Sequence, residues 1–136
     1  MLRKIGIVAL WWLVGWICPA AAPQTKKCKG NERLVGDCFK VHGRMTMGNG
    51  GPAIRIWRIG TDRKLGVWDD DEEPNVAWLP SRISKVLDED HQIFADFEVC
   101  PLTKEKADEL QIVCVESASK TVIRDVRNKN ESKGRL

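Results

Sequence analysis

Apolar and polar residues alternate regularly along residues 38–47, which is the clearest β-strand pattern in the chain. One side of this predicted strand is apolar: Phe39, Val41, Met45 and Met47. The other side is polar: Lys40, His42, Arg44 and Thr46. Burying Lys40 or Arg44 without a partner is costly, whereas burying a large apolar side chain gains about 1.5–3 kcal/mol. We therefore expect the apolar side to face the core and the polar side to face solvent.

Further short patterns follow along the chain. Glycines within residues 48–51 predict a hairpin turn that leads into a second strand over 53–59. Four more strands are expected, over 65–68, 93–100, 111–116 and 121–126. Residues 81–90 have helical spacing of apolar positions, with Ser81 as a cap, and the charged stretch 103–109 suits a single helical turn. The pattern predicts a mostly β fold, a small antiparallel barrel or sandwich with one short helix.

Residues 1–20 have the three parts of a secretory signal peptide. Arg3 and Lys4 are positive, the apolar run 5–17 follows, and small residues come next at Ala20–Ala22. The run is shorter than the roughly 20 residues that a membrane helix needs. An uncleaved anchor and a lipid-bearing Cys18 are the alternatives to cleavage before Ala21.

The chain then divides into a polar leader over 21–36, a β domain over 37–126 and a disordered tail over 127–136. We expect a periplasmic or secreted protein that touches the membrane only through its signal segment. Its partner would be another envelope or extracellular component.

Composition and charge narrow the classes of function. The chain has 136 residues, 43% hydrophobic and 30% charged, which suits one globular domain. Its 22 Lys and Arg against 19 Asp and Glu leave a net charge of +3. Dedicated nucleic-acid binders are far more basic, so no nucleic-acid partner is expected.

Four cysteines remain once Cys18 leaves with the signal peptide: Cys28, Cys38, Cys100 and Cys114. An even set is typical of exported proteins with disulfide bonds. Three pairings are possible. The sequence-local one joins Cys28 to Cys38 and Cys100 to Cys114, and it is favoured because each pair brackets a short polar connection, worth about 2–3 kcal/mol in the loop-entropy model.

Metal and cofactor patterns are incomplete. No CxxC pair is present, and His42 and His91 are not at zinc-finger spacing. The acidic run 69–73 starts like a calcium loop, but Pro74 stands where the turn glycine belongs. The glycines of 48–51 lack the following lysine and helix of a phosphate loop. We expect neither a metal nor a cofactor.

Three segments carry a resemblance to known proteins: RIWRIGTDRKLGV (Arg55–Val67), DFEVCPLT (Asp96–Thr103) and VCVESAS (Val113–Ser119). The chain resembles small exported proteins of alphaproteobacteria over roughly residues 38–125. That family has no assigned activity, so the resemblance implies a bacterial exported protein and transfers no catalytic residue. It also implies that Cys100 and Cys114 are a matched pair, because both lie inside the resembling segments.

Catalytic arrangements are weak. No GxSxG is present, and Cys38 and His42 on one strand face would stand about 13 Å apart at roughly 3.3 Å per residue. Asp96 and Glu98 share a strand face at a separation that glycoside hydrolysis could use. We do not expect an enzyme, but a small hydrolase that uses Asp96 and Glu98 stays open.

A binding surface is the favoured reading. Lys40, His42 and Arg44 would form an outer basic row, and Arg55 would extend it if the hairpin forms. The tryptophans beyond the signal segment are further candidates, with core packing as the alternative: Trp57, Trp68 and Trp78. The sequence thus predicts a non-catalytic binding module in the bacterial cell envelope, with a hydrolase or a structural envelope component as alternatives.

Overall fold

A computed structural model describes residues 28–68 and 78–127. Its elements, in chain order, are β1 (Phe39–Met47), β2 (Ile54–Arg58), β3 (Lys64–Val67), α1 (Ser81–Ser84), β4 (His91–Pro101) and β5 (Gln111–Asp125). The predicted signal peptide, the first part of the leader, the acidic run 69–73 and the tail from 128 onward lie outside the described residues.

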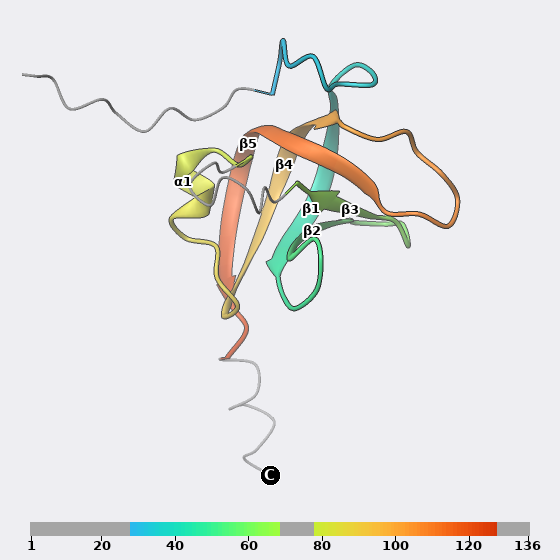
Figure 1. Cartoon of the computed structure of the whole chain (residues 1–136). Coiled ribbons are helices and arrows are strands. Elements are labelled where there is room, and N and C mark those ends of the chain that lie inside the picture. Colours follow the sequence, from blue (N-terminus) through green and yellow to red (C-terminus); the bar gives the residue numbers. More distant parts are fainter. Residues whose placement is uncertain (1–27, 69–77, 128–136) are drawn as a thin grey trace, which may run out of the picture.

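The five strands close into a barrel in the order β1-β2-β3-β5-β4 (Figure 1). The prediction of a mostly β fold with one short helix is confirmed, and the barrel is the form it takes. Neighbouring strands are antiparallel except β3 and β5, which run parallel from Leu65↔Gln111 to Val67↔Val113. The prediction did not include this parallel pair, whose two strands are separated in the sequence by α1 and β4.

Strand β1 lies between two partners. Its residues Phe39–Met45 pair with β4, and its residues Gly43–Met47 pair with β2. The predicted hairpin at 48–51 is confirmed, with the Gly48 amide donating to the Ala53 carbonyl over 3.0 Å. This shared strand decides which side chains of the outer surface meet.

The prediction of two separate strands over 111–116 and 121–126 is wrong, because β5 is continuous through the serines. Ser117 and Ser119 stay in register with Glu98 and Asp96 of β4. The Ser117 hydroxyl donates to the Glu98 carboxylate over 3.3 Å, so a residue typical of turns is held inside a strand. The β4–β5 register shifts on both sides of these serines, and one of the two shifts falls beside Lys120, whose φ is 51°.

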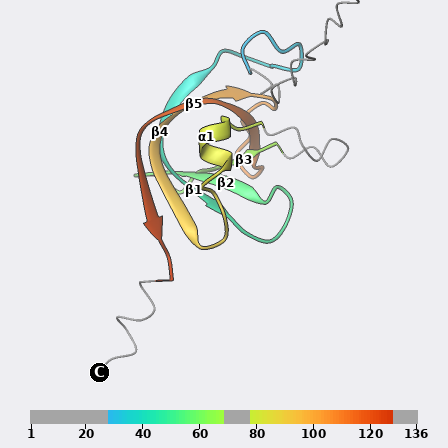
Figure 2. The same cartoon turned by 90° about the vertical axis from the view of Figure 1, so that its left-hand side faces the viewer.

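Helix α1 is shorter than predicted and covers one end of the barrel, as the two views show together (Figures 1 and 2). Pro80 is the N-cap, so Ser81 does not cap the helix with its side chain. Ile83 and Leu87 are buried as their spacing predicted. The single helical turn expected over 103–109 is also wrong, since bends, turns and irregular backbone connect β4 to β5 there.

The core consists of the inward sides of the strands. Every residue predicted to face inward on β4 is at most 1% exposed: Ile93, Ala95, Phe97 and Val99. Val41 and Met45 of β1 are buried with them, and Phe39 and Met47 pack partly buried against this cluster. The period-2 interpretation of both strands is therefore confirmed. No helix among the residues described is long and apolar enough to cross a membrane.

All four cysteines form disulfides, but the predicted pairing is wrong. The bonds join Cys28 to Cys114 and Cys38 to Cys100, with Cα–Cα distances of 5.8 and 4.0 Å. Cys100 and Cys114 are register partners in the antiparallel β4–β5 pair. Cys38 nevertheless bonds to Cys100, because β1 pairs with the other edge of β4 and Cys38 directly precedes Phe39, the partner of Val99. The two bonds are consistent with an oxidising location outside the cytoplasm.

Candidate functional site

The outer side of β1 meets a different neighbour in each half. Lys40 and His42 stand opposite Glu98 and Asp96 of β4. Farther along the same strand, Arg44 stands opposite Trp57 of β2, and Thr46 stands opposite Arg55. Because directly opposite residues share a face of the sheet, the row predicted to be basic divides into two different surfaces.

The first half carries balanced charge. His42 Nδ1–H donates to Asp96 Oδ1 over 2.7 Å, and the Lys120 ammonium lies 3.5 Å from the other oxygen of Asp96. The hydrogen bond from His42, with Lys120 adding to it, lowers the pKa of Asp96. The predicted candidates Lys40 and His42 therefore lie beside carboxylates and do not extend a basic surface from Arg44.

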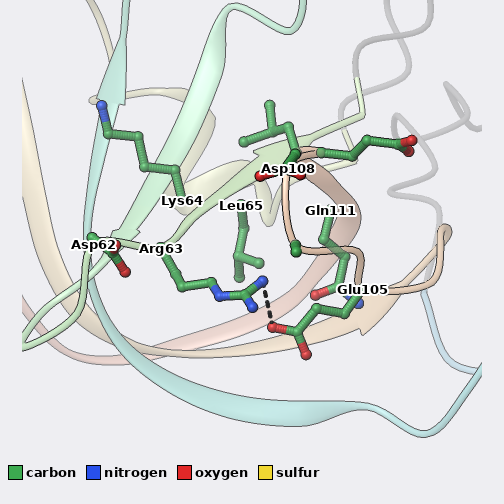
Figure 3. A pocket seen from close by; sticks show the side chains of 10 residues that line it. Asp62, Arg63, Lys64, Leu65, Glu105, Asp108 and Gln111 are labelled. Carbon is green, nitrogen blue, oxygen red and sulfur yellow. Dashed lines mark ion pairs between the residues drawn. The ribbon is translucent and has the colours of Figure 1, made fainter.

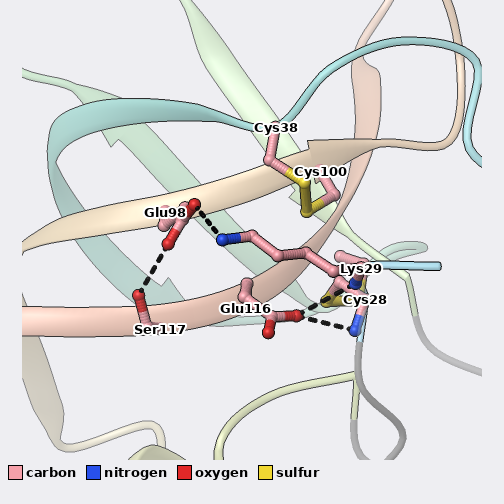
Figure 4. The surroundings of a disulfide bond; sticks show 8 residues. Cys28, Lys29, Cys38, Glu98, Cys100, Glu116 and Ser117 are labelled. Carbon is pink, nitrogen blue, oxygen red and sulfur yellow. Dashed lines mark hydrogen bonds and ion pairs between the residues drawn. A yellow bond between two sulfur atoms is a disulfide. The ribbon is translucent and has the colours of Figure 1, made fainter.

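Glu98 is engaged in the same way by the N-terminal segment. Lys29 Nζ lies 2.8 Å from Glu98 Oε1 (Figure 4). This hydrogen bond lowers the pKa of Glu98 and raises the pKa of Lys29. A glycosidase needs one carboxyl group with a raised pKa as its general acid. The pKa is lowered, not raised, in both Asp96 and Glu98.

The second half forms a hollow of about 170 Å³ without a carboxylate in its lining. We call it the cationic hollow, and it is lined by Arg44, Thr46, Gly48, Asn49, Ala53, Arg55, Trp57 and Lys64. Strands β1, β2 and β3 contribute to it, together with the β1–β2 turn. Lys64 belongs to the set because it stands opposite Trp57 in the β2–β3 pair.

Side chains in the cationic hollow are positioned by local contacts. The Arg44 guanidinium carbon lies 4.7 Å from the centre of the Trp57 ring, a cation–π arrangement. The Trp57 indole N–H donates to the Thr61 carbonyl over 2.6 Å, and Arg55 Nε donates to the Pro52 carbonyl over 3.3 Å. Arg44 Nε is buried and has no hydrogen-bond partner among the residues that the structure describes. The hollow therefore holds ordered cationic groups with donor capacity left over.

The three candidate tryptophans have different positions. Trp78 is 3% exposed and belongs to the core, which is the alternative the sequence left open. Trp68 is 39% exposed and follows β3, where its backbone N–H donates to the Val113 carbonyl. Trp57 alone of the three lines the cationic hollow.

Sequence reasoning singled out Arg44, Arg55 and Trp57 but missed Lys64. The third strand was predicted to begin at residue 65, one position too late, so Lys64 fell outside the predicted strands. Its place opposite Trp57 depends on the β2–β3 register, which the sequence pattern does not reveal.

Two larger hollows have other chemistry. One of about 510 Å³ lies between the β2–β3 turn and the β4–β5 connection, where Arg63 and Glu105 form an ion pair of 2.9 Å (Figure 3). Four acidic residues line it against two cations, Arg63 and Lys64, so its lining is net acidic, and Lys64 borders both this hollow and the cationic one. Another of about 490 Å³ lies between α1 and β5 and is more apolar, with Ile83, Val86 and Ile123 in its lining. Its two charged lining residues are both cations, and both are engaged: Arg82 donates to the Ala118 carbonyl over 3.0 Å, and the Lys120 ammonium lies 3.5 Å from Asp96 Oδ2.

Sulfur and carboxylate groups also meet at the disulfides. The Sγ atoms of Cys28 and Cys100 and a carboxylate oxygen of Glu116 lie within 4.8 Å of one another. Glu116 accepts hydrogen bonds from the backbone N–H groups of Cys28 and Lys29, over 2.8 and 3.1 Å (Figure 4). Metals bind thiolates, whereas both sulfurs here belong to disulfides. The cluster fastens the N-terminal segment to the barrel.

No protein-family model matches the chain, and neither the curated proteins nor the solved structures contain a significant match.

Proposed function

We propose that this protein is an exported, non-catalytic binding module of the bacterial cell envelope, and that it holds an acidic partner in the cationic hollow. The observation that carries the proposal is the lining of that hollow: Arg44, Arg55 and Lys64 share it with Trp57, and no carboxylate is among them. The folded surface holds these like charges close together, and their mutual repulsion falls when an anionic group binds.

Electrostatics support this use of the site. Hydrogen bonds from guanidinium groups to anionic oxygens are about twice as strong as neutral ones, and Arg presents its donors as a planar fork. Arg44 and Arg55 are each tethered by one contact, to Trp57 and to Pro52, so little side-chain freedom is left to lose on binding.

Strand order gives weaker support. The order β1-β2-β3-β5-β4, with the helix between β3 and β4, is similar to that of OB-fold barrels. In such barrels the face of strands 2 and 3 and the β1–β2 loop hold oligonucleotides or oligosaccharides. The cationic hollow lies on that face. A shared fold does not by itself imply a shared function, so the proposal depends on the side chains.

Export accords with the signal pattern of residues 1–20 and with the two disulfides. The final location would be the periplasm or the exterior.

The alternative of a hydrolase depends on Asp96 and Glu98. Both carboxyl groups are held by cations and have lowered pKa values, which suits ion pairs and not proton donation. Cys38 is in a disulfide and offers no thiol to His42. A structural envelope component, the other alternative, would not depend on the charge of the hollow.

Binding to heparin, a sulfated and carboxylated polyanion, tests the proposal. We expect the double variant Arg44→Gln/Arg55→Gln to bind heparin at least about tenfold more weakly than the wild type, since one charged hydrogen bond contributes about 1.5–3 kcal/mol. Isothermal titration calorimetry at low salt measures the difference.

Arg124→Gln is the matched control, because Arg124 also lies over an aromatic ring, 4.9 Å from the centre of Phe94, but outside the hollow. This control variant should bind heparin with an affinity within about twofold of that of the wild type. Equal affinities of the wild type and the hollow variant, or an equal loss in the control, would overturn the proposal.

A further inference from the structure

We propose that the cationic hollow is a binding site for a phosphomonoester group, carried by a sugar or a lipid headgroup. This inference rests on the proposed function, and it narrows the acidic partner to one kind of anion. Three features of the hollow support it: its charge, its donors and its size.

Charge is the first feature. Three cationic side chains line the hollow, and the outward carboxylates of neighbouring β4 are already engaged by His42, Lys120 and Lys29. Neither Arg44, Arg55 nor Lys64 forms an ion pair within the part of the chain that the structure covers. A carboxylate would neutralise one of these charges, whereas a phosphomonoester carries about −1.5 to −2 at pH 7. A phosphomonoester dianion therefore matches the three positive charges of the hollow better than a carboxylate does.

Hydrogen-bond donors are the second feature. Arg44 contributes a buried Nε–H that has no partner in the described structure, besides its terminal N–H groups. Arg55 uses Nε on the Pro52 carbonyl and so keeps its terminal nitrogens for a ligand. Lys64, the Thr46 hydroxyl and the Asn49 amide complete a donor set from several directions. A planar carboxylate accepts in one plane, whereas the three terminal oxygens of a phosphomonoester accept around a tetrahedron.

Size is the third feature. A hollow of about 170 Å³ is smaller than the roughly 300–1,000 Å³ of sites that enclose a whole small molecule. It admits one compact group, while the remainder of the ligand lies outside. Trp57 borders the hollow with its indole N–H engaged by Thr61 and with Arg44 over its ring, so the apolar ring surface that Arg44 leaves uncovered is available to whatever adjoins the phosphate.

A matched series of ligands tests the inference: glucose 6-phosphate, glucuronate and glucose, which share a ring and differ in charge. The titrations follow the side-chain N–H signals of Trp57 and Arg44 by nuclear magnetic resonance. We expect saturable shifts with glucose 6-phosphate, at least about tenfold weaker binding of glucuronate, and no shift with glucose.

Lys64→Gln is the test variant, because Lys64 is exposed and its replacement leaves the core intact. It should weaken glucose 6-phosphate binding about fivefold or more, while the control Arg124→Gln does not.

Two further binding experiments identify the source of the phosphate group. Binding of inorganic phosphate with similar affinity would point to the free ion, and sedimentation with vesicles that contain phosphatidic acid, but not with pure phosphatidylcholine vesicles, would point to a lipid. The second result supports a phosphomonoester carried by a lipid, whereas the first shows a site for the phosphate dianion itself and overturns the need for a sugar or lipid carrier.

Two outcomes would overturn it. If heparin binds at the hollow but glucuronate binds as tightly as glucose 6-phosphate, the phosphomonoester inference is wrong and the proposed function stands. If neither heparin nor any phosphorylated ligand depends on the hollow, both are wrong.

Discussion

Gly43 of β1 lies where the barrel leaves no room for a side chain. A Cβ atom there would lie 2.5 Å from Ile56 Cγ2 and 3.2 Å from the Trp57 carbonyl oxygen. The side of β1 that carries Val41 and Met45 points into the barrel, and the missing side chain at position 43 leaves room for Ile56 and Phe97. The residue next to the cationic hollow is therefore selected by packing inside the barrel.

Gly43→Ala should destabilise the protein by about 1–3 kcal/mol, because the added methyl group overpacks a close-packed core. Urea unfolding measures the change in the free energy of unfolding. Gly48→Ala is the control, since a Cβ at that position meets nothing within 4 Å. A similar stability of the two variants would contradict the close approach.

At the scale of the elements, the disulfides tie the N-terminal segment to the barrel at two strands. Their members are 86 and 62 residues apart, far more than in the predicted local pairing. In the loop-entropy model such long loops contribute about 4–5 kcal/mol each, against about 2–3 kcal/mol for the short ones. The observed pairing constrains the unfolded chain more strongly.

Non-reducing peptide mapping should find Cys28 linked to Cys114 and Cys38 linked to Cys100. The variant Cys28→Ser/Cys114→Ser should lose about 2–5 kcal/mol of stability, the usual cost of removing a native disulfide from a small exported domain. A peptide that links Cys100 to Cys114 would show that the cross-strand neighbours are bonded after all.

For the molecule as a whole, the outward carboxylates of β4 are held by groups that are distant in the sequence. Lys29 of the N-terminal segment forms an ion pair with Glu98, and His42 of β1 forms a hydrogen bond with Asp96. Asp96 and Glu98 have pKa values below their ordinary 3.8 and 4.5, so their stabilisation is complete above those values and is lost as pH falls through the lower pKa values of the folded state. The pKa of Lys29 is above its ordinary 10.5, so its stabilisation is lost only as pH rises through that higher value.

Stability should therefore be level around neutral pH and fall when the pH is lowered to about 3. Glu98→Gln should show a smaller loss between about pH 7 and about pH 3 than the wild type, because it lacks one of the carboxylates that must be protonated. Urea unfolding at both pH values measures this difference. Glu89→Gln, at an exposed position without an ion pair to another described residue, should keep the full loss. An unchanged loss in Glu98→Gln would contradict the role of the Lys29 pair.

The sequence alone determined the class of fold, the place of the short helix after Pro80 and the inward sides of β1 and β4. These follow from alternation and turn residues within a few positions, and burial of Phe97 and Met45 leaves one orientation for each strand. The same local reasoning found Arg44, Arg55 and Trp57, because the hairpin at 48–51 places them on one outer face.

Only the tertiary structure decided which strands are neighbours, and the errors trace to that. Cys38 bonds to Cys100, and Lys40 and His42 face carboxylates, because β1 lies against β4. Lys64 joins the cationic hollow because β3 lies against β2. Contacts between distant segments depend on closure of the barrel, and no local pattern of residues encodes that closure.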